Sequence, residues 1–262
     1  MREGTPETQP RPSAESQEAA DFGDDGDEEE DSQQTQAADA LLDPDLRRVI
    51  AEARRGAPSA LYALEQRSER GRTKQEWLAL AQGRLKRRQV GESLKAYEKA
   101  LDMDPALAGD ARMMSGLRYF AEKESTYETV LKFAAEHMGA PGADLIFHVW
   151  ASTSRVTPHT QKAKEFLDDP GVRKNMSTAL RLAMELRNAP GCVEVEAMLP
   201  EILTHADDRS LMRLKDLNKT DGCGDDGKQD CYPCLRDSSL LQDAITQVQM
   251  RGAPRFGRRR WR

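Results

Sequence analysis

The segment from residue 74 to residue 105, KQEWLALAQGRLKRRQVGESLKAYEKALDMDP, constrains the fold of this chain more than any other. A hydroxyl and a carboxylate three positions apart, at Thr73 and Glu76, form the capping box that opens a helix. A glycine marks a break, and a second helix runs through Leu101. Pro105 ends that helix, because proline cannot continue the backbone hydrogen bonding. The spacing therefore predicts two short helices joined by a turn.

This segment resembles the tetratricopeptide unit of roughly 34 residues, a helix–turn–helix module that stacks into arrays. With Pro105 as the closing proline of the family pattern, the resemblance implies these packing positions: Trp77, Leu80, Ala81, Tyr97, Ala100 and Pro105. Two positions depart from the pattern, with Arg84 in place of an aromatic residue and Ser93 in place of an alanine. The resemblance also implies a partner-binding groove on the first helix, with the candidates Lys74, Gln75, Gln82 and Lys86.

One such unit does not bury its own apolar face, so at least three normally stack together. The flanking sequence fits the pattern in degenerate form, and the later segments resemble generic antiparallel helix pairs of the HEAT kind. We therefore expect an all-α fold, an α-solenoid or irregular helical repeat array over residues 43–217. An ordinary helical bundle is the alternative.

Local signals place the remaining helices. Asp43 and Pro44 start the first ordered helix, and Pro58 opens the second. Further helices are expected at about 107–121, 125–137, 142–152, 158–168, 171–187, 193–204 and 208–217, with a capping box over Ser125–Glu128. Residues 218–250 are expected to form a cysteine-containing loop and a capping helix that begins near Ser239.

The charge distribution separates the ends of the chain from its body. Residues 1–44 hold 14 acidic and 2 basic residues, a net charge of −12. The whole chain has a net charge of −6, so residues 45–262 have a net charge of +6. Residues 1–42 bury too little apolar surface to fold and are predicted to be a disordered acidic tail or linker. Residues 251–262 are predicted to be a basic flexible tail. A short basic end is more often nonspecific or a partner for the acidic N-terminus than a nucleic-acid-binding site, so no nucleic-acid function is expected.

The cysteines permit three interpretations. Cys223, Cys231 and Cys234 lie within twelve residues, and Cys231 and Cys234 have the spacing of zinc ligands, with Cys192 or His205 as a possible fourth. Alternatively, Cys223 forms a disulfide with Cys231 or Cys234, as in oxidising compartments. The third interpretation is a redox-active or free thiol. No cofactor is predicted beyond this possible structural zinc.

The segment DCYPCLR, after a run of short helices, resembles the end of helical regions in bacterial multidomain proteins. Some of those proteins carry Ser/Thr kinase or zinc-ribbon modules, so the resemblance implies a regulatory or signalling context. It covers roughly residues 140–255. A regulatory C-terminal region of a kinase-type protein, or a zinc or thiol protein, is therefore the alternative function.

No phosphate-binding, dinucleotide-binding, nucleophile-elbow or HExxH motif occurs, so we predict a protein that is not an enzyme. The expected function is a protein–protein interaction scaffold in bacterial signalling or complex assembly, with an unknown protein partner. No apolar run is long enough for a membrane helix, and no signal peptide begins the chain. The expected location is cytoplasmic, or periplasmic or membrane-tethered if further sequence lies upstream.

Overall fold

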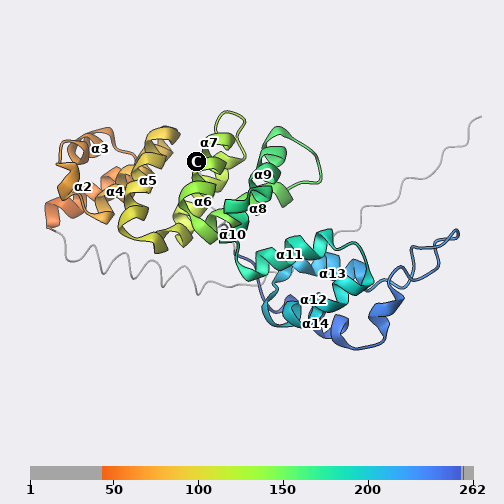
Figure 1. The fold of residues 1–262 in the computed structure, drawn as a ribbon. Helices are drawn as coiled ribbons and strands as arrows, with labels where there is room; N and C mark the ends of the chain where they lie inside the picture. Colours follow the sequence, from red (N-terminus) through yellow and green to blue (C-terminus); the bar gives the residue numbers. More distant parts are fainter. Residues whose placement is uncertain (1–42, 255, 257–262) are drawn as a thin grey trace, which may run out of the picture. The chain divides into compact units, whose positions relative to one another are not determined.

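A computed structural model describes residues 43–254 and 256. The predicted acidic tail and most of the predicted basic tail lie outside these residues. Within the described ranges the regular elements are helices, and the only bridge between extended residues joins Cys223 to Gln229 (Figure 1). The predicted all-α class is therefore confirmed.

The first eight α-helices are α2 (Pro44–Arg54), α3 (Pro58–Glu65), α4 (Lys74–Lys86), α5 (Val90–Met103), α6 (Ala111–Ala121), α7 (Tyr127–His137), α8 (Gly139–Ala151) and α9 (Pro158–Asp168). Five more follow: α10 (Pro170–Asn175), α11 (Thr178–Asn188), α12 (Cys192–His205), α13 (Leu211–Leu217) and α14 (Leu240–Gln249). Short 3-10 helices lie between some of them, including η2 (Pro105–Gly109), η3 (Asp208–Ser210) and η4 (Pro233–Arg236).

Helix starts agree with the sequence where a side chain satisfies free backbone amides. The Asp43 carboxylate accepts hydrogen bonds from the first turn of α2. At the start of α4 the Thr73 hydroxyl accepts from the Glu76 amide, and the Glu76 carboxylate accepts from the Thr73 amide. Asp104 ends α5 and caps η2, which Pro105 opens. The unit over residues 74–105 thus has the predicted local structure.

Two local predictions are wrong. The expected capping box over Ser125–Glu128 does not form, because α7 starts one residue later, with Thr126 as its N-cap. The Thr126 hydroxyl does not cap the helix either, since it donates to the Phe120 carbonyl at 2.7 Å. The single helix expected over 171–187 is two helices. Its interruption lies at Met176 and Ser177, whose backbones are extended, and the Ser177 side chain caps α11.

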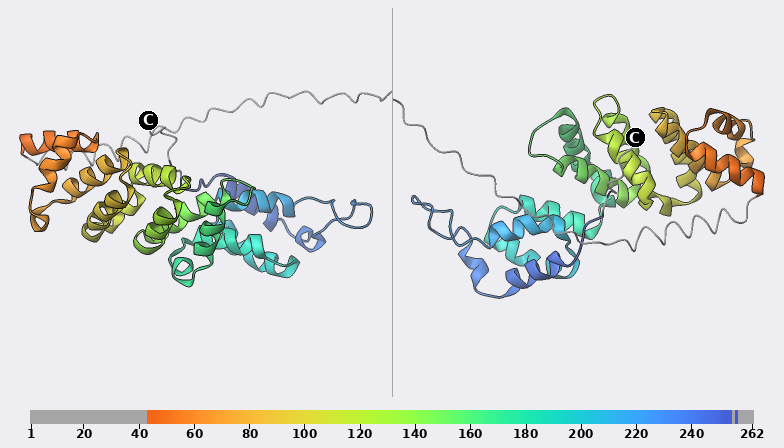
Figure 2. Two further views of the ribbon diagram at one scale, coloured as in Figure 1. Left: turned by 90° about the horizontal axis from the view of Figure 1, so that it is seen from above. Right: turned by 180° about the vertical axis from the view of Figure 1, so that it is seen from behind.

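Helices α2 to α9 pack in a regular order along the chain (Figures 1 and 2). Consecutive helices contact each other in the pairs α2–α3, α4–α5, α6–α7 and α8–α9. The first helices of these pairs also contact one another in series, α2 with α4, α4 with α6 and α6 with α8. Among the second helices, α5 contacts α7 and α7 contacts α9. First helices therefore meet first helices, and these second helices meet second helices.

The α4–α5 interface explains both departures from the tetratricopeptide pattern. Ser93 is buried, and its hydroxyl donates to the Ala81 carbonyl at 2.7 Å, so a polar residue joins the two helices where a methyl group is usual. Arg84 forms an ion pair with Glu65 of α3 at 2.9 Å and donates to the Glu92 carbonyl of α5. It thereby links three helices from the position of the usual aromatic residue.

Gly83 sets the distance between α2 and α4. A Cβ atom at this position would lie 2.0 Å from the Ala53 carbonyl oxygen, which is backbone and has no rotamer to change. We therefore expect Gly83→Ala to force α2 and α4 apart and to lower the free energy of unfolding by about 3 kcal/mol, measured by urea denaturation.

Gly91 is the matched control for this substitution. It lies in the first turn of α5, and a Cβ there would meet nothing within 4 Å. Gly91→Ala should be neutral or stabilising by about 0.5–1 kcal/mol, because alanine has less conformational freedom in the unfolded chain. Equal losses in the two variants would contradict the close approach of α2 and α4.

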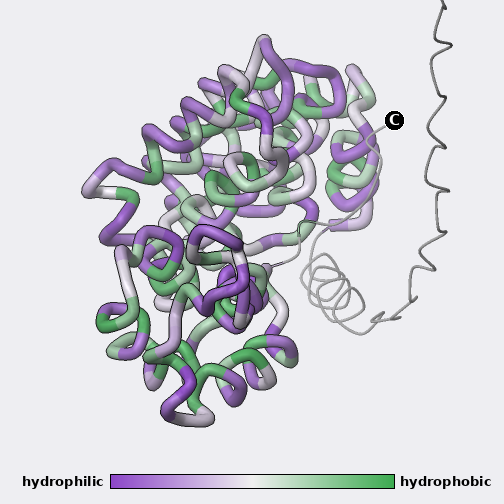
Figure 3. The backbone as a smooth tube through the Cα atoms, turned by 90° about the vertical axis from the view of Figure 1, so that its right-hand side faces the viewer, coloured by the Kyte–Doolittle hydropathy of each residue, from purple (hydrophilic) through white to green (hydrophobic). Residues whose placement is uncertain are grey.

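The buried apolar residues form two clusters. The first contains side chains of α2 to α11 together with Phe256, and the second contains side chains of α11 to α14. Leu180 and Met184 of α11 belong to the first cluster, whereas Leu182 and Leu186 belong to the second. Figure 3 shows hydrophobic and hydrophilic residues alternating along the helices, as expected when each helix buries one side. The boundary at residue 217 stays a prediction.

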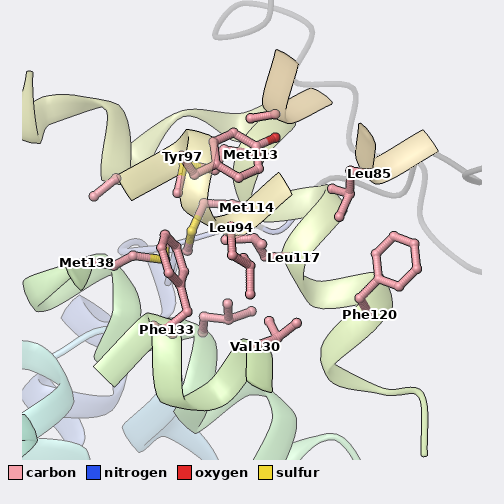
Figure 4. Packing of buried hydrophobic residues seen from close by; sticks show 14 of the residues in the cluster. Leu85, Leu94, Tyr97, Met113, Met114, Leu117, Phe120, Val130, Phe133 and Met138 are labelled. Atoms are coloured by element: carbon pink, nitrogen blue, oxygen red, sulfur yellow. The ribbon is translucent and has the colours of Figure 1, made fainter. Parts of the chain in front are cut away.

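Tyr97 belongs to the first cluster, and Figure 4 shows its ring beside Met113. Its side chain is fully buried, and within the described residues its hydroxyl has no hydrogen-bond partner. Tyr97→Phe removes a buried hydroxyl and keeps the ring. We therefore expect unchanged stability or a gain of about 1 kcal/mol, whereas Tyr97→Ala should lose about 3–5 kcal/mol by leaving a cavity.

The burial of the Tyr97 hydroxyl also makes the stability of the protein depend on pH. Burial, with a smaller contribution from the charge of Asp110, raises the pKa of the Tyr97 phenol. In the unfolded chain the phenol ionises near pH 10, while the buried one stays protonated, so stability should fall as the pH rises above about 10. Tyr97→Phe should lose less stability over this range than the wild type, and parallel curves would count against the burial of the hydroxyl.

Candidate functional site

The predicted groove residues of α4 differ in their surroundings. Lys74 forms an ion pair with Asp104 at 2.6 Å, which joins the start of α4 to the end of α5. Its hydrogen bond is the largest of the influences that lower the pKa of Asp104. Gln75 and Gln82 are partly buried and Lys86 is exposed. Their spacing of seven and four residues places these three on one side of α4, while a partner-binding role stays a prediction.

Five of the six predicted packing residues of the same unit are buried. Leu80, Ala81, Tyr97 and Ala100 are at most 1% exposed and Trp77 is 8% exposed, while Pro105 is exposed at the start of η2. The Arg72 guanidinium lies 4.4 Å from the centre of the Trp77 ring and donates to three carbonyls, those of Leu64, Glu65 and Arg67. Trp77 thus supports the end of α3 as well as the α4–α5 pair.

All four cysteines are paired in disulfides. Cys223 bonds to Cys231, one of the two pairings that the sequence left open. Cys234 bonds to Cys192 at the start of α12, a pairing that the sequence analysis did not include. The sequence suggested Cys192 only as a metal ligand. The even number of cysteines, four, is the sequence signal that indicates a second disulfide.

The two disulfides hold different structures. Cys223–Cys231 closes a small loop in which Cys223 and Gln229 exchange two backbone hydrogen bonds of 2.9 Å. Gly222, Gly224 and Gly227 in or beside this loop have positive φ, which glycine adopts without strain. Cys192–Cys234 spans 42 residues and ties η4, with the buried Leu235, to α12 within the second cluster.

The metal interpretation stays a prediction. Within the described residues no group of three or more histidine, cysteine or acidic side chains is arranged around a common point. In the disulfide form the cysteine sulfurs are not thiolates, the form in which cysteine binds zinc. A zinc site at Cys223, Cys231 and Cys234 therefore applies to the reduced protein.

A buried charge cluster connects α8 to η3. Arg209 of η3 forms ion pairs with Asp144 of α8 and with Asp207, and all three side chains are less than a tenth exposed. The Arg209 Nε atom lies 2.9 Å from an Asp207 oxygen. Burial raises the pKa of Asp144, and the Arg209 charge opposes that shift. No sequence motif marks this cluster, since 65 residues separate Asp144 from Arg209.

Beside this cluster, the segment after α14 returns to the first helices. The Phe256 ring lies 4.7 Å from the His148 ring of α8, centre to centre, and Arg118 of α6 donates to the Phe256 carbonyl at 2.8 Å. Between this segment and α8 lies a cavity of about 160 Å³, with Asp144, His148 and Arg209 among its lining residues. Burial lowers the pKa of His148, and the nearby Arg118 charge lowers it further.

No protein-family model, curated protein or solved structure matches the chain. Within residues 43–254 and 256, the helices are too short or too polar to cross a membrane.

Proposed function

We propose that this chain is a protein–protein interaction scaffold of the tetratricopeptide type, in which the helix pairs of residues 44–168 present a surface to a protein partner. The serial contact of first helices, from α2 through α4 and α6 to α8, carries this proposal. In stacked repeats such contacts line up equivalent helices along one side, and that side forms an extended binding surface.

The residues on α4 supply the chemistry of that surface. Gln75, Gln82 and Lys86 offer amide and ammonium groups on one side of the helix. Lys74 pairs with Asp104 and therefore has a structural role before any partner binds. A partner segment with main-chain carbonyls and acidic side chains would complement the other three.

The disulfide-linked residues from α12 onward would close one end of the array. End units of repeat proteins need their own cover, because no further repeat follows to bury their apolar face. The Arg209–Asp144 ion pair and the Phe256 contact join this region to α8. The two disulfides further favour an oxidising compartment, such as the periplasm, as the native location.

Affinity capture with matched variants tests the scaffold. We expect the wild-type chain to retain at least one partner from an extract of its source cells that the double variant Gln82→Glu/Lys86→Glu loses. The control is Lys99→Glu on α5, whose side chain is 53% exposed and which should retain the same partner. Partners lost equally in both variants, or retained equally in both, would count against binding at the first helices.

A further inference from the structure

The segment that follows α14 has the contacts of a bound peptide. Residues 251–254 and 256 adopt neither helix nor strand conformation. Their polar groups are nevertheless paired with the body of the protein: the Asp208 amide donates to the Arg251 carbonyl at 3.0 Å, and the Ala253 amide donates to the Asp208 carboxylate at 2.9 Å. Main-chain pairing of an extended segment is one way in which proteins bind peptides.

Two side chains anchor this segment at its ends. The Arg251 guanidinium donates to the carbonyls of Leu203 and Ala206, at the end of α12, where helix carbonyls have no partner in the helix itself. Phe256 is only 9% exposed and belongs to the first hydrophobic cluster, although α14 belongs to the second. A buried aromatic anchor of this kind contributes much of the binding energy in protein interfaces.

The surface beneath the segment belongs to two first helices, α6 and α8. His148 contacts the Phe256 ring, and Arg118 binds the Phe256 main-chain carbonyl, a group that every polypeptide carries. The segment does not fill the surface, since a cavity of about 160 Å³ remains beside Phe256. The surface therefore accommodates an aromatic side chain and leaves space beside it. Arg118 supplies a hydrogen-bond donor for the main chain of the residue that carries the ring.

We infer that this surface of α6 and α8 is a docking site for an extended segment of a protein partner that carries an aromatic side chain. Ala253, Pro254 and Phe256 cover the site in the unbound chain and must leave it when the partner binds. This inference rests on the proposed scaffold function and adds its regulation. An attached segment competes at high effective concentration, so its release would raise the affinity for the partner.

The test uses the segment itself as the probe. A fluorescein-labelled peptide with the sequence of residues 250–262 is titrated with the full chain, and binding is measured by fluorescence polarisation. The wild-type chain should bind weakly because its site is filled, and Phe256→Ala should bind about tenfold more tightly. Met250→Ala is the matched control, because Met250 is 68% exposed and should leave the weak binding unchanged.

Two further comparisons separate aromatic recognition from attraction between charges. A peptide with alanine in place of its phenylalanine keeps the arginine-rich charge and should bind the Phe256→Ala chain at least about tenfold more weakly. Adding His148→Ala to the Phe256→Ala chain should also remove the tight binding. Equal binding of both peptides, or no gain in the Phe256→Ala chain, would overturn the inference.

Hydrogen exchange on the wild-type chain does not depend on the folding of any variant. An excess of peptide should speed exchange at residues 251–253 and 256, and unchanged exchange at saturating peptide would overturn the inference. The scaffold proposal is tested separately by affinity capture. A partner that the wild-type and Phe256→Ala chains bind with equal affinity would support the scaffold and refute its control by this segment.

Discussion

Replacing Arg209 with methionine should lower the free energy of unfolding by about 3–5 kcal/mol. Arg209 is the shared partner of Asp144 and Asp207, and none of these three side chains is more than 9% exposed. Methionine keeps most of the volume but leaves two carboxylates, each less than a tenth exposed, without a countercharge. The measurement is urea denaturation at pH 7 with the wild type alongside.

The loss in Arg209→Met should become smaller as the pH falls. Burial already raises the pKa of Asp144, and removing the Arg209 charge raises it further. The folded variant therefore binds a proton at a pH where the unfolded chain does not, so its stability relative to wild type improves on acidification. A loss that is constant between pH 7 and pH 4.5 would show that the carboxylates are not its cause.

Arg181→Met is the matched control. Arg181 also contacts two carboxylates, those of Glu185 and Glu201, but its side chain is 40% exposed. Ion pairs in water contribute about 0–1 kcal/mol, because solvent screens the charges. Similar losses for Arg181→Met and Arg209→Met would contradict the burial of the charge cluster formed by Arg209, Asp144 and Asp207.

The features that the sequence predicted correctly depend on residues close together in the chain. Asp43, Thr73 and Asp104 cap helices through atoms two or three residues away, so the same residues identify the helix and its start. Ala81 and Ala100, which the family resemblance places at the contact of α4 and α5, are both buried, while their role as repeat packing positions stays a prediction.

The features that the sequence did not predict depend on distant residues. Arg118 and Phe256 are 138 positions apart, and neither carries a motif that indicates the other. Cys192 is separated from Cys234 by 42 residues, and local spacing favoured the three clustered cysteines instead. The break at Ser177 is a different case, because its cause lies within three residues. Helical periodicity continues through it, but the serine side chain competes with the helix by capping the next one.

Removing the Cys192–Cys234 disulfide should destabilise the chain more than removing the Cys223–Cys231 disulfide. A disulfide limits the freedom of the unfolded chain, and this effect grows with the length of the loop it closes. For separations of 42 and 8 residues the loop-closure relation gives about 4 and about 2.5 kcal/mol. The measurement compares Cys192→Ser/Cys234→Ser with Cys223→Ser/Cys231→Ser by denaturation without reductant.

The two double variants should also lose stability in different parts of the protein. Cys234 packs against the second hydrophobic cluster and Cys192 begins α12, so their removal should speed hydrogen exchange in α12 and α14 while α4 and α5 stay protected. Removal of Cys223–Cys231 should affect mainly the small loop that it closes. The intact mass of the wild type first checks that both disulfides are present, because their reduction must add four hydrogen atoms, one for each sulfur. Equal losses in both double variants would mean that loop closure is not how these bonds stabilise the fold.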